Sequence, residues 1–145
     1  MRISIVTPTF NSMPFIEEML SNIRSQNYPE VEHIVVDNLS TDGTVECVRK
    51  ESRAKLVSEK DKGQSDAINK GFLLSSGDIL AWQNADDLYE PGTLSSIAEF
   101  FEKNPEVHMV YGDYRVIDES ANWICDVHPI PWNQWLFAHG RFVPL

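Results

Sequence analysis

Two adjacent carboxylates, Asp86 and Asp87, are the residues of this sequence best suited to chemistry. They close a polar segment, residues 83–87, that follows a short apolar run. Like charges on neighbouring residues repel, but carboxylate oxygens are the ligands that a hard divalent cation such as Mg²⁺ or Mn²⁺ prefers. A cation held there would bridge to a diphosphate and stabilise it as a leaving group. A solvated acidic turn that caps the next helix is the alternative interpretation.

Two further polar segments contain residues that suit a nucleotide. Asp37, at the start of residues 37–44, can accept hydrogen bonds from a base imide or a ribose hydroxyl. An Asx turn followed by a helix cap explains the same pattern without a ligand, and by itself is the stronger interpretation. Residues 61–71 place Lys62 and Gly63 before a predicted helix, an arrangement that suits phosphate. Each segment alone is a weak signal.

The chain is acidic, with a formal net charge of −10 at pH 7. This charge disfavours sequence-independent binding to nucleic acid or to an anionic membrane. It also disfavours direct binding of a phosphate, unless a divalent cation lies between the carboxylates and the phosphate. The charge balance is therefore consistent with a metal site and inconsistent with a nucleic-acid partner.

Cysteine usage and hydropathy point to a reducing compartment. Cys47 and Cys125 lack metal-ligand spacing and are expected to be small buried residues. No apolar run reaches the length of a membrane span, and the N-terminus carries no signal sequence. We therefore expect a cytoplasmic protein without a membrane span, with peripheral attachment at the inner membrane face as the alternative location.

Strand-like and helix-like segments alternate along the chain. Apolar runs predict strands at residues 3–7 (closed by Pro8), 31–37, 56–58, 79–82 and 107–111. Helical spacing predicts helices at residues 15–23, 44–50, 65–74 and one with Pro91 in its first turn. Residues 116–117 and 123–124 predict a hairpin. This order predicts an α/β fold with a mostly parallel sheet and helices on both faces.

The predicted fold also gathers the polar segments. The carboxyl ends of parallel strands meet at one edge of the sheet, and ligands bind there in such folds. Residues 7–11, Asp37 and the pair Asp86 and Asp87 all lie at or just past predicted strand ends. We expect them to line one site.

Taken in order, these segments resemble glycosyltransferase family 2, whose members adopt the GT-A fold, a Rossmann-like fold. The resemblance covers residues 3–112. Its pieces are Ile5-Val6-Thr7-Pro8-Thr9-Phe10-Asn11, Val35-Val36-Asp37 with Ser40-Thr41-Asp42-Gly43-Thr44, Lys62-Gly63-Gln64-Ser65-Asp66-Ala67-Ile68-Asn69-Lys70-Gly71, Gly77-Asp78-Ile79, and Asn84-Ala85-Asp86-Asp87 with Pro91-Gly92. Each piece is modest alone, but their shared order is specific.

The resemblance implies an inverting, metal-assisted glycosyltransferase. Its donor would be a UDP- or GDP-linked sugar, its acceptor a saccharide or a lipid-linked molecule, and polysaccharide biosynthesis is a common setting of the family. The nucleotide-binding residues that it implies are Thr7, Pro8, Thr9, Asn11, Asp37, Asn38, Lys62, Gly63 and Asp86. Asp86 and Asp87 correspond to the family's DxD motif, with Asp87 as the direct ligand of Mn²⁺ or Mg²⁺ and Asp86 nearer the ribose or sugar. Asn38 stands where many members have a second acid, so pairing with uracil is not assured.

The resemblance also divides the chain into two regions. Residues 1–112 would bind the nucleotide sugar, and residues 113–145 would begin an acceptor-side region. The family's catalytic base lies in an acceptor-side segment that has no match before Leu145, and we therefore expect a truncated, N-terminal donor-binding portion. Asp113 is the remaining candidate for the base.

Three aromatic residues near the end of the sequence have several possible roles. They would line an acceptor site, be covered by further sequence or, if the chain ends at Leu145, form an exposed patch that promotes self-association. Packing into a core is the commoner role of such residues. These residues are Trp132, Trp135 and Phe137.

Three other functions compete with a glycosyltransferase as interpretations of these segments. The main alternative is a nucleotide-sugar-binding module without turnover, because the base segment is absent. A nucleotidyltransferase is disfavoured, since residues 9–13 contain neither glycine nor a cation after the first strand. A nicotinamide-dependent dehydrogenase is disfavoured because no G-x-G-x-x-G sequence follows that strand.

Overall fold

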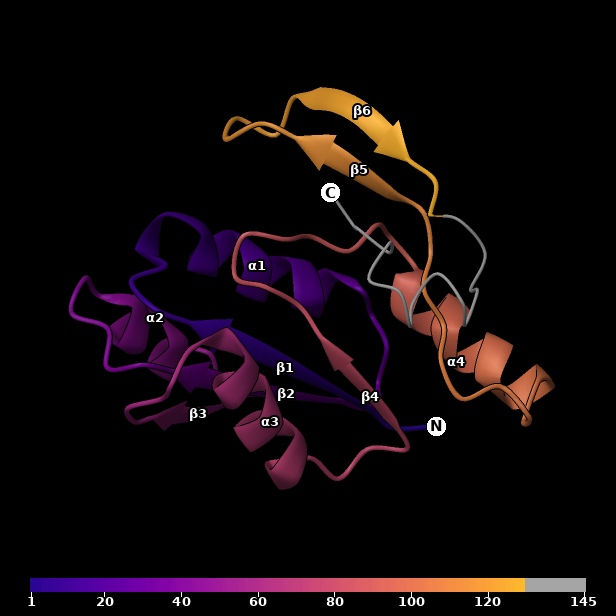
Figure 1. Cartoon of the computed structure of the whole chain (residues 1–145), viewed down its shortest axis with the longest axis horizontal. Helices are drawn as coiled ribbons and strands as arrows, with labels where there is room; N and C mark the ends of the chain where they lie inside the picture. The colour runs from indigo at the N-terminus through magenta and orange to yellow at the C-terminus, as the bar shows by residue number, and fades with distance from the viewer. Residues whose placement is uncertain (130–145) are drawn as a thin grey trace, which may run out of the picture. The chain divides into compact units, whose positions relative to one another are not determined.

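The computed structural model describes residues 1–129, and the chain divides into two compact units, Met1–Glu106 and a second that begins at Val107. The first unit contains a parallel sheet with the strand order β3-β2-β1-β4 (Figure 1). Its strands are β1 (Ile3–Thr9), β2 (Val31–Asp37), β3 (Ala54–Ser58) and β4 (Ile79–Trp82). Its helices are α1 (Met13–Ser25), α2 (Thr44–Lys50), α3 (Gln64–Leu74) and α4 (Thr93–Lys103).

The second unit contains the predicted hairpin. Strands β5 (Tyr114–Ile117) and β6 (Trp123–Val127) pair antiparallel. The predicted roles of residues 1–112 and 113–145 stay predictions. Along the chain, the first unit ends at Glu106 and the second begins at Val107. Within residues 1–129, no helix is long and apolar enough to cross a membrane.

Helices cover both faces of the sheet, as the sequence predicts. Successive side chains of a strand point to opposite faces, so Ile3 and Ile5 of β1 join one core cluster and Val6 joins the other. The first cluster is closed by α1, α2 and α4, and the second by α3. Figure 1 shows α1 and α3 on opposite faces of the sheet. The α/β prediction is therefore confirmed.

The predicted end of the first strand at Pro8 is wrong, because β1 continues to Thr9. Pairing of β1 with β4 stops at Val6 and Trp82, whereas pairing with β2 reaches Thr9 and Asp37. The Val6 carbonyl accepts a hydrogen bond from the backbone N–H of Gln83, the residue after β4. Backbone polar groups two residues apart in a strand point the same way, so the backbone nitrogen of Pro8 also faces β4. A proline has no N–H to extend that ladder. Pro8 thus ends one ladder without ending the strand.

Two other local predictions are wrong. Pro91 does not lie in the first turn of a helix, because α4 begins at Thr93 after Gly92, whose φ of 81° is left-handed. Residues 107–111 do not form a strand. Apolar, β-branched residues favour a strand only where a neighbouring strand pairs with them and their side chains are partly buried. In this segment the side chain of Met109 is 61% exposed.

Close approach of α3 to the sheet depends on Gly71. A Cβ atom at this position would lie 2.3 Å from a methyl carbon of Val6, a fully buried residue of β1. Neither atom could move away cheaply, because native cores are close-packed. Gly71 therefore sets how near the helix lies to the strand that ends at the site.

We predict that Gly71→Ala lowers the free energy of unfolding by about 1–3 kcal/mol, since overpacking outweighs the better helix propensity of alanine. Urea denaturation would measure this change. The double variant Gly71→Ala, Val6→Ala should recover part of the loss relative to Val6→Ala alone, because the clashing methyl groups are gone. Equal losses in both backgrounds would contradict the packing explanation.

Candidate functional site

A crevice opens where the strand order of the sheet reverses. The chain adds β2 and β3 on one side of β1 and then places β4 on the other side. In open α/β sheets, ligands bind at this reversal, beyond the carboxyl ends of the strands. Because Pro8 stops the β1–β4 ladder early, the segments that follow these two strands can separate. The structure has a cavity of about 530 Å³ at this point.

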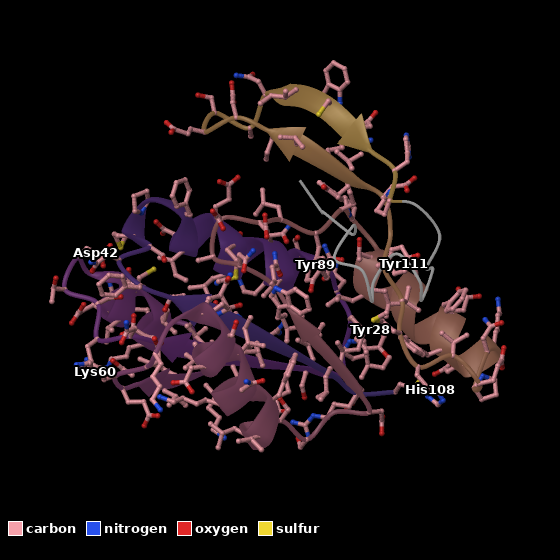
Figure 2. The ribbon with its side chains drawn as sticks, viewed as in Figure 1. Tyr28, Asp42, Lys60, Tyr89, His108 and Tyr111 are labelled. Carbon is pink, nitrogen blue, oxygen red and sulfur yellow. The ribbon has the colours of Figure 1, made fainter. Side chains whose placement is uncertain are left out.

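The cavity is lined by the loops after all four parallel strands and by the first turns of α1 and α3. Figure 2 labels Asp42 and Lys60, whose loops follow β2 and β3 and lie at the same end of the sheet. The lining residues are Pro8, Thr9, Phe10, Asn11, Ser12, Phe15, Asn38, Asp61, Gly63, Gln64, Ala67, Asn84, Ala85 and Asp86.

Most of the residues expected to bind a nucleotide line this cavity. They are Pro8, Thr9, Asn11, Asn38, Gly63 and Asp86. Thr7, Asp37 and Lys62 are not among the lining residues, and neither is the predicted metal ligand Asp87. The structure thus brings the predicted segments together, while the role of each residue toward a ligand stays a prediction.

Asp37 is fully buried and hydrogen-bonded on both carboxylate oxygens. It accepts hydrogen bonds from the Thr9 hydroxyl at 3.2 Å and the Ser58 hydroxyl at 2.9 Å. The backbone N–H of Ser40 donates to it at 3.0 Å, and the Ser40 hydroxyl donates as well. A buried carboxylate is tolerated only with such donors. Asp37 therefore joins the carboxyl ends of β1, β2 and β3.

Asn38, the next residue, faces the cavity with a defined amide orientation. Its Oδ1 accepts the backbone N–H of Asp61 at 2.9 Å, and its own N–H donates to the Thr9 carbonyl at 3.0 Å. This leaves Nδ2, which has no hydrogen-bond partner within residues 1–129, as the group available to a ligand. Asn38 thus offers the cavity a donor.

Two non-glycine residues beside the cavity adopt left-handed backbone conformations. They are Asn11, with φ 49°, and Leu39, with φ 57°. Asparagine tolerates this region, but a leucine there costs about 1–2 kcal/mol. Side-chain bonds hold the two loops: Ser40 Oγ accepts the Asn11 N–H at 2.8 Å, and Asn11 Oδ1 accepts the Thr41 N–H at 3.0 Å. Two of the four non-glycine residues with positive φ within residues 1–129 therefore lie beside the cavity.

The pair Asp86 and Asp87 lies in a tight turn after β4. The Asp87 N–H donates to the Asn84 carbonyl at 3.3 Å, and buried Gln83 donates from Nε2 to the Asp87 carbonyl at 2.7 Å. Asn84 Nδ2 donates to Asp87 Oδ2 at 2.9 Å. Desolvation raises the pKa of Asp87, and the nearby charge of Asp86 raises it further. Within residues 1–129, neither carboxylate forms an ion pair.

These carboxylates fit a divalent cation. The described part of the chain offers no group of three acidic, histidine or cysteine ligands. Mg²⁺ and Mn²⁺ do not require one, because they are commonly held by one or two carboxylates and complete their shells with phosphate oxygens and water. Burial in this turn disfavours the negative charge of Asp87. A cation at Asp86 and Asp87 would compensate that charge.

The start of α3 forms the opposite wall of the cavity. Gly63 has a left-handed φ of 115° and lines the cavity. The backbone N–H of Lys62 donates to Asp66 Oδ2 at 3.0 Å, which ties the loop to the first turn of α3. The side chain of Lys62 is exposed, whereas the neighbouring cation Lys70 is paired with Glu59 at 2.9 Å. Lys60 and Lys62 are thus exposed cations of this loop that form no ion pair within residues 1–129, and Lys62 is the one next to Gly63.

Several cavity residues were not among the predicted site residues. Phe10 and Phe15 are 60% and 39% exposed and line the cavity. An aromatic residue directly after a strand end is a usable sequence signal, since a core aromatic would lie within the strand. Gln64, Asn84 and Asp61 also line the cavity, but their roles depend on hydrogen bonds across the sheet edge that the sequence does not reveal.

The candidate base Asp113 belongs to the second unit. Its Oδ2 lies 2.7 Å from Nδ1 of His128, and both side chains are exposed. The hydrogen bond to Asp113 raises the pKa of His128. The role of Asp113 as a base stays a prediction. The aromatic residues Trp132, Trp135 and Phe137 lie outside the described residues.

The sequence matches the family described as Glycosyl transferase family 2 over residues 4–140. The chain belongs to glycosyltransferase family 2. A relative, the PGL/p-HBAD biosynthesis glycosyltransferase of Mycobacterium tuberculosis, is 34% identical over 126 residues, covering 83% of this chain and 49% of the relative. The family assignment made from the sequence is confirmed.

Two solved structures are similar in fold. The crystal structure of S. aureus TarS 1–349 in complex with UDP-GlcNAc has a TM-score of 0.68 and 28% identity, covering 72% of this chain and 32% of that chain. The mannosyltransferase PcManGT from Pyrobaculum calidifontis, in complex with GDP-Man and Mn²⁺, has a TM-score of 0.66 and 32% identity. The match covers 81% of this chain and 36% of that chain. The fold is GT-A, and the chain spans less than half of each of these proteins.

A buried histidine beneath the site gives the first unit a defined acid sensitivity. His33 in β2 is 4% exposed, and one ring nitrogen lies 2.9 Å from the Thr7 hydroxyl. Burial lowers the pKa of His33 to about 4, against a small opposing effect of Glu51. The unfolded chain therefore binds a proton at higher pH than the folded chain does.

We predict that the His33 contribution to stability is full above pH 6.5 and falls by roughly 3 kcal/mol as the pH drops towards 4. Urea denaturation of the wild type and of His33→Gln across this range would measure it. The difference between the two curves isolates His33 from the carboxylates. Parallel curves would contradict the prediction.

Proposed function

We propose that this chain is the donor-binding portion of a metal-dependent glycosyltransferase, which moves a sugar from a nucleoside-diphosphate donor to an acceptor. The observation that carries the proposal is the cavity at the reversal of strand order, with Asp86 in its lining and Asp87 in the same turn. Support comes from the two similar structures, one in complex with UDP-GlcNAc and one with GDP-Man and Mn²⁺.

The nucleoside would bind at the β1–β2 side of the cavity. The exposed ring of Phe10 offers a face on which a base can stack, and Asn38 Nδ2 offers a donor to a base carbonyl. Uracil and guanine both carry such a carbonyl, so UDP and GDP remain the two candidates. Asp37 would act by holding Thr9 and the loop of Asn38, because its own oxygens are already hydrogen-bonded.

The diphosphate would bind at the β4 side of the cavity. Asp87 and Asp86 would hold Mn²⁺ or Mg²⁺, and Lys62 with the N–H groups at the start of α3 would lie near the phosphates. When bound, the cation supplies positive charge that stabilises the departing nucleoside diphosphate. The protein groups orient the donor and keep its sugar at the mouth of the cavity.

The remaining features of the proposal concern the acceptor. We propose an inverting reaction in which a carboxylate deprotonates the acceptor hydroxyl, with Asp113 as the candidate of this chain. We further propose that the acceptor is a saccharide or a lipid-linked molecule. The proposed setting is bacterial polysaccharide assembly, and the proposed location is cytoplasmic, either free or at the inner membrane face. Self-association through the aromatic residues near the end of the sequence is proposed on composition alone.

A binding module without turnover is the second candidate. It is favoured by one observation: the acidic residues that line the cavity are Asp61 and Asp86, and Asp61 Oδ1 already accepts the Gly63 N–H at 2.8 Å. No other carboxylate lines the cavity within residues 1–129. Nucleotide binding without release of nucleoside diphosphate from a sugar donor, in the presence of acceptors, would favour this candidate.

We predict that the chain binds UDP or GDP in the presence of Mn²⁺, and that Asp87→Ala removes the metal-dependent part of this affinity because a direct ligand is lost. Calorimetric titration with each nucleotide, with Mn²⁺ and with chelator, would measure it. Glu99→Gln on α4 is the matched control, since it removes an exposed carboxylate that pairs with Lys103. Equal binding by Asp87→Ala and Glu99→Gln would contradict the metal site.

We also predict that Phe10→Ala weakens nucleotide binding by about 1–3 kcal/mol, the usual contribution of one base stacked on an aromatic ring. The loss should be the same with and without Mn²⁺, because the ring lies on the base side of the cavity. Phe100→Ala, which truncates an exposed aromatic on α4, serves as the control. An effect of Phe10→Ala that vanishes in chelator would contradict the stacking role.

A further inference from the structure

A chain of hydrogen bonds crosses the edge of the cavity and ends on the proposed metal ligand. Gln64, the first residue of α3, donates from Nε2 to Asn84 Oδ1 at 2.7 Å. Asn84, two residues after β4, donates from Nδ2 to Asp87 Oδ2 at 2.9 Å. The chain therefore connects two elements that are far apart in sequence.

The direction of these bonds is fixed by the chemistry of the amide group. An asparagine side chain has one acceptor end and one donor end. Because the Asp87 carboxylate only accepts, Asn84 must turn its NH₂ group towards Asp87 and its oxygen towards the donating NH₂ group of Gln64. If Gln64 were lost, the Asn84 amide would lose the bond that holds its oxygen and would be freer to rotate away from Asp87. Gln64 thus acts on Asp87 without touching it.

The same region of the turn holds both the main chain and the side chain of Asp87. Its main chain is held by Gln83 at 2.7 Å and by the turn to Asn84. Its side chain is held through Oδ2, so the rotation that would carry Oδ1 away from a bound cation is restricted. Groups that orient a ligand in this way commonly change metal affinity 10–100-fold when they are removed.

We propose that Gln64 and Asn84 are positioning residues for the metal site, with Asn84 orienting the Asp87 carboxylate and Gln64 orienting Asn84. This inference rests on the proposed function, because it requires a cation at Asp87. It assigns part of the cation affinity to two uncharged residues. It also makes the first residue of α3 a determinant of metal binding.

The test measures Mn²⁺ affinity directly. Electron paramagnetic resonance would report free Mn²⁺ in titrations of the wild type, Asn84→Ala, Gln64→Ala and the double variant, all with the same concentration of UDP or GDP. We expect Asn84→Ala to weaken Mn²⁺ binding about 10–100-fold and Gln64→Ala to weaken it by a smaller factor. The double variant should match Asn84→Ala within about twofold, because Gln64 acts only through Asn84.

Two controls separate positioning from general damage. Ser65→Ala changes the next residue of α3, which is exposed and does not line the cavity, and should leave Mn²⁺ affinity unchanged. Thermal unfolding should be the same in all variants, since Gln64 is exposed and Asn84 is only partly buried. A purely structural role would change thermal unfolding as well as Mn²⁺ affinity, and would overturn the proposal.

The outcomes distinguish the proposal from the function on which it rests. If the wild type and Asp87→Ala bind Mn²⁺ equally, the metal site itself is wrong and the proposal falls with it. If Asp87→Ala loses binding while Asn84→Ala and Gln64→Ala match the wild type, only the positioning role is overturned. Additive losses in the double variant would overturn the relay, because they would show that Gln64 acts independently of Asn84.

Discussion

The geometry of the site depends on burying one carboxylate, that of Asp37. Moving an ionised group out of water costs several kcal/mol unless hydrogen-bond donors replace the solvent. Here the donors come from three strand ends: Thr9 of β1, Ser40 after β2 and Ser58 of β3. The requirement to satisfy Asp37 therefore fixes these ends relative to one another. The loop of Asn38 and the left-handed residues beside it follow from that arrangement.

The other side of the cavity is held by neutral amides and not by a buried charge. Gln83 holds the main chain of Asp87, and Asn84 holds its side chain. The bond from Gln83 joins two neutral groups and contributes about 1 kcal/mol, whereas the bond from Asn84 ends on a carboxylate and is stronger. The acidic turn can thus keep two unpaired carboxylates at the surface. Under the proposed function, a bound cation would compensate the charge of Asp86 and Asp87, and the phosphates of the donor would then meet a positive charge.

Periodicity predicted the first unit well because its strands and helices bury one-sided apolar patterns. The ranges of β2, α2 and β4 match the predictions, and the prediction of helices on both faces is confirmed. Residues 107–111 show the limit of this reasoning: composition does not say whether a ladder is available. Pro8 shows another limit, since a proline ends a ladder on one side only, and strand order decides which side matters.

The sequence by itself determined the family, the α/β fold and the segments that form the site, because these depend on local pattern and on the order of motifs. Only the tertiary structure separated the buried Asp37 from the accessible Asn38, since adjacent residues of a strand end point in opposite directions. It alone revealed the link from Gln64 through Asn84 to Asp87. Hydrogen bonds between residues distant in sequence arise from the crossing of α3 over the sheet, and no local pattern encodes that meeting.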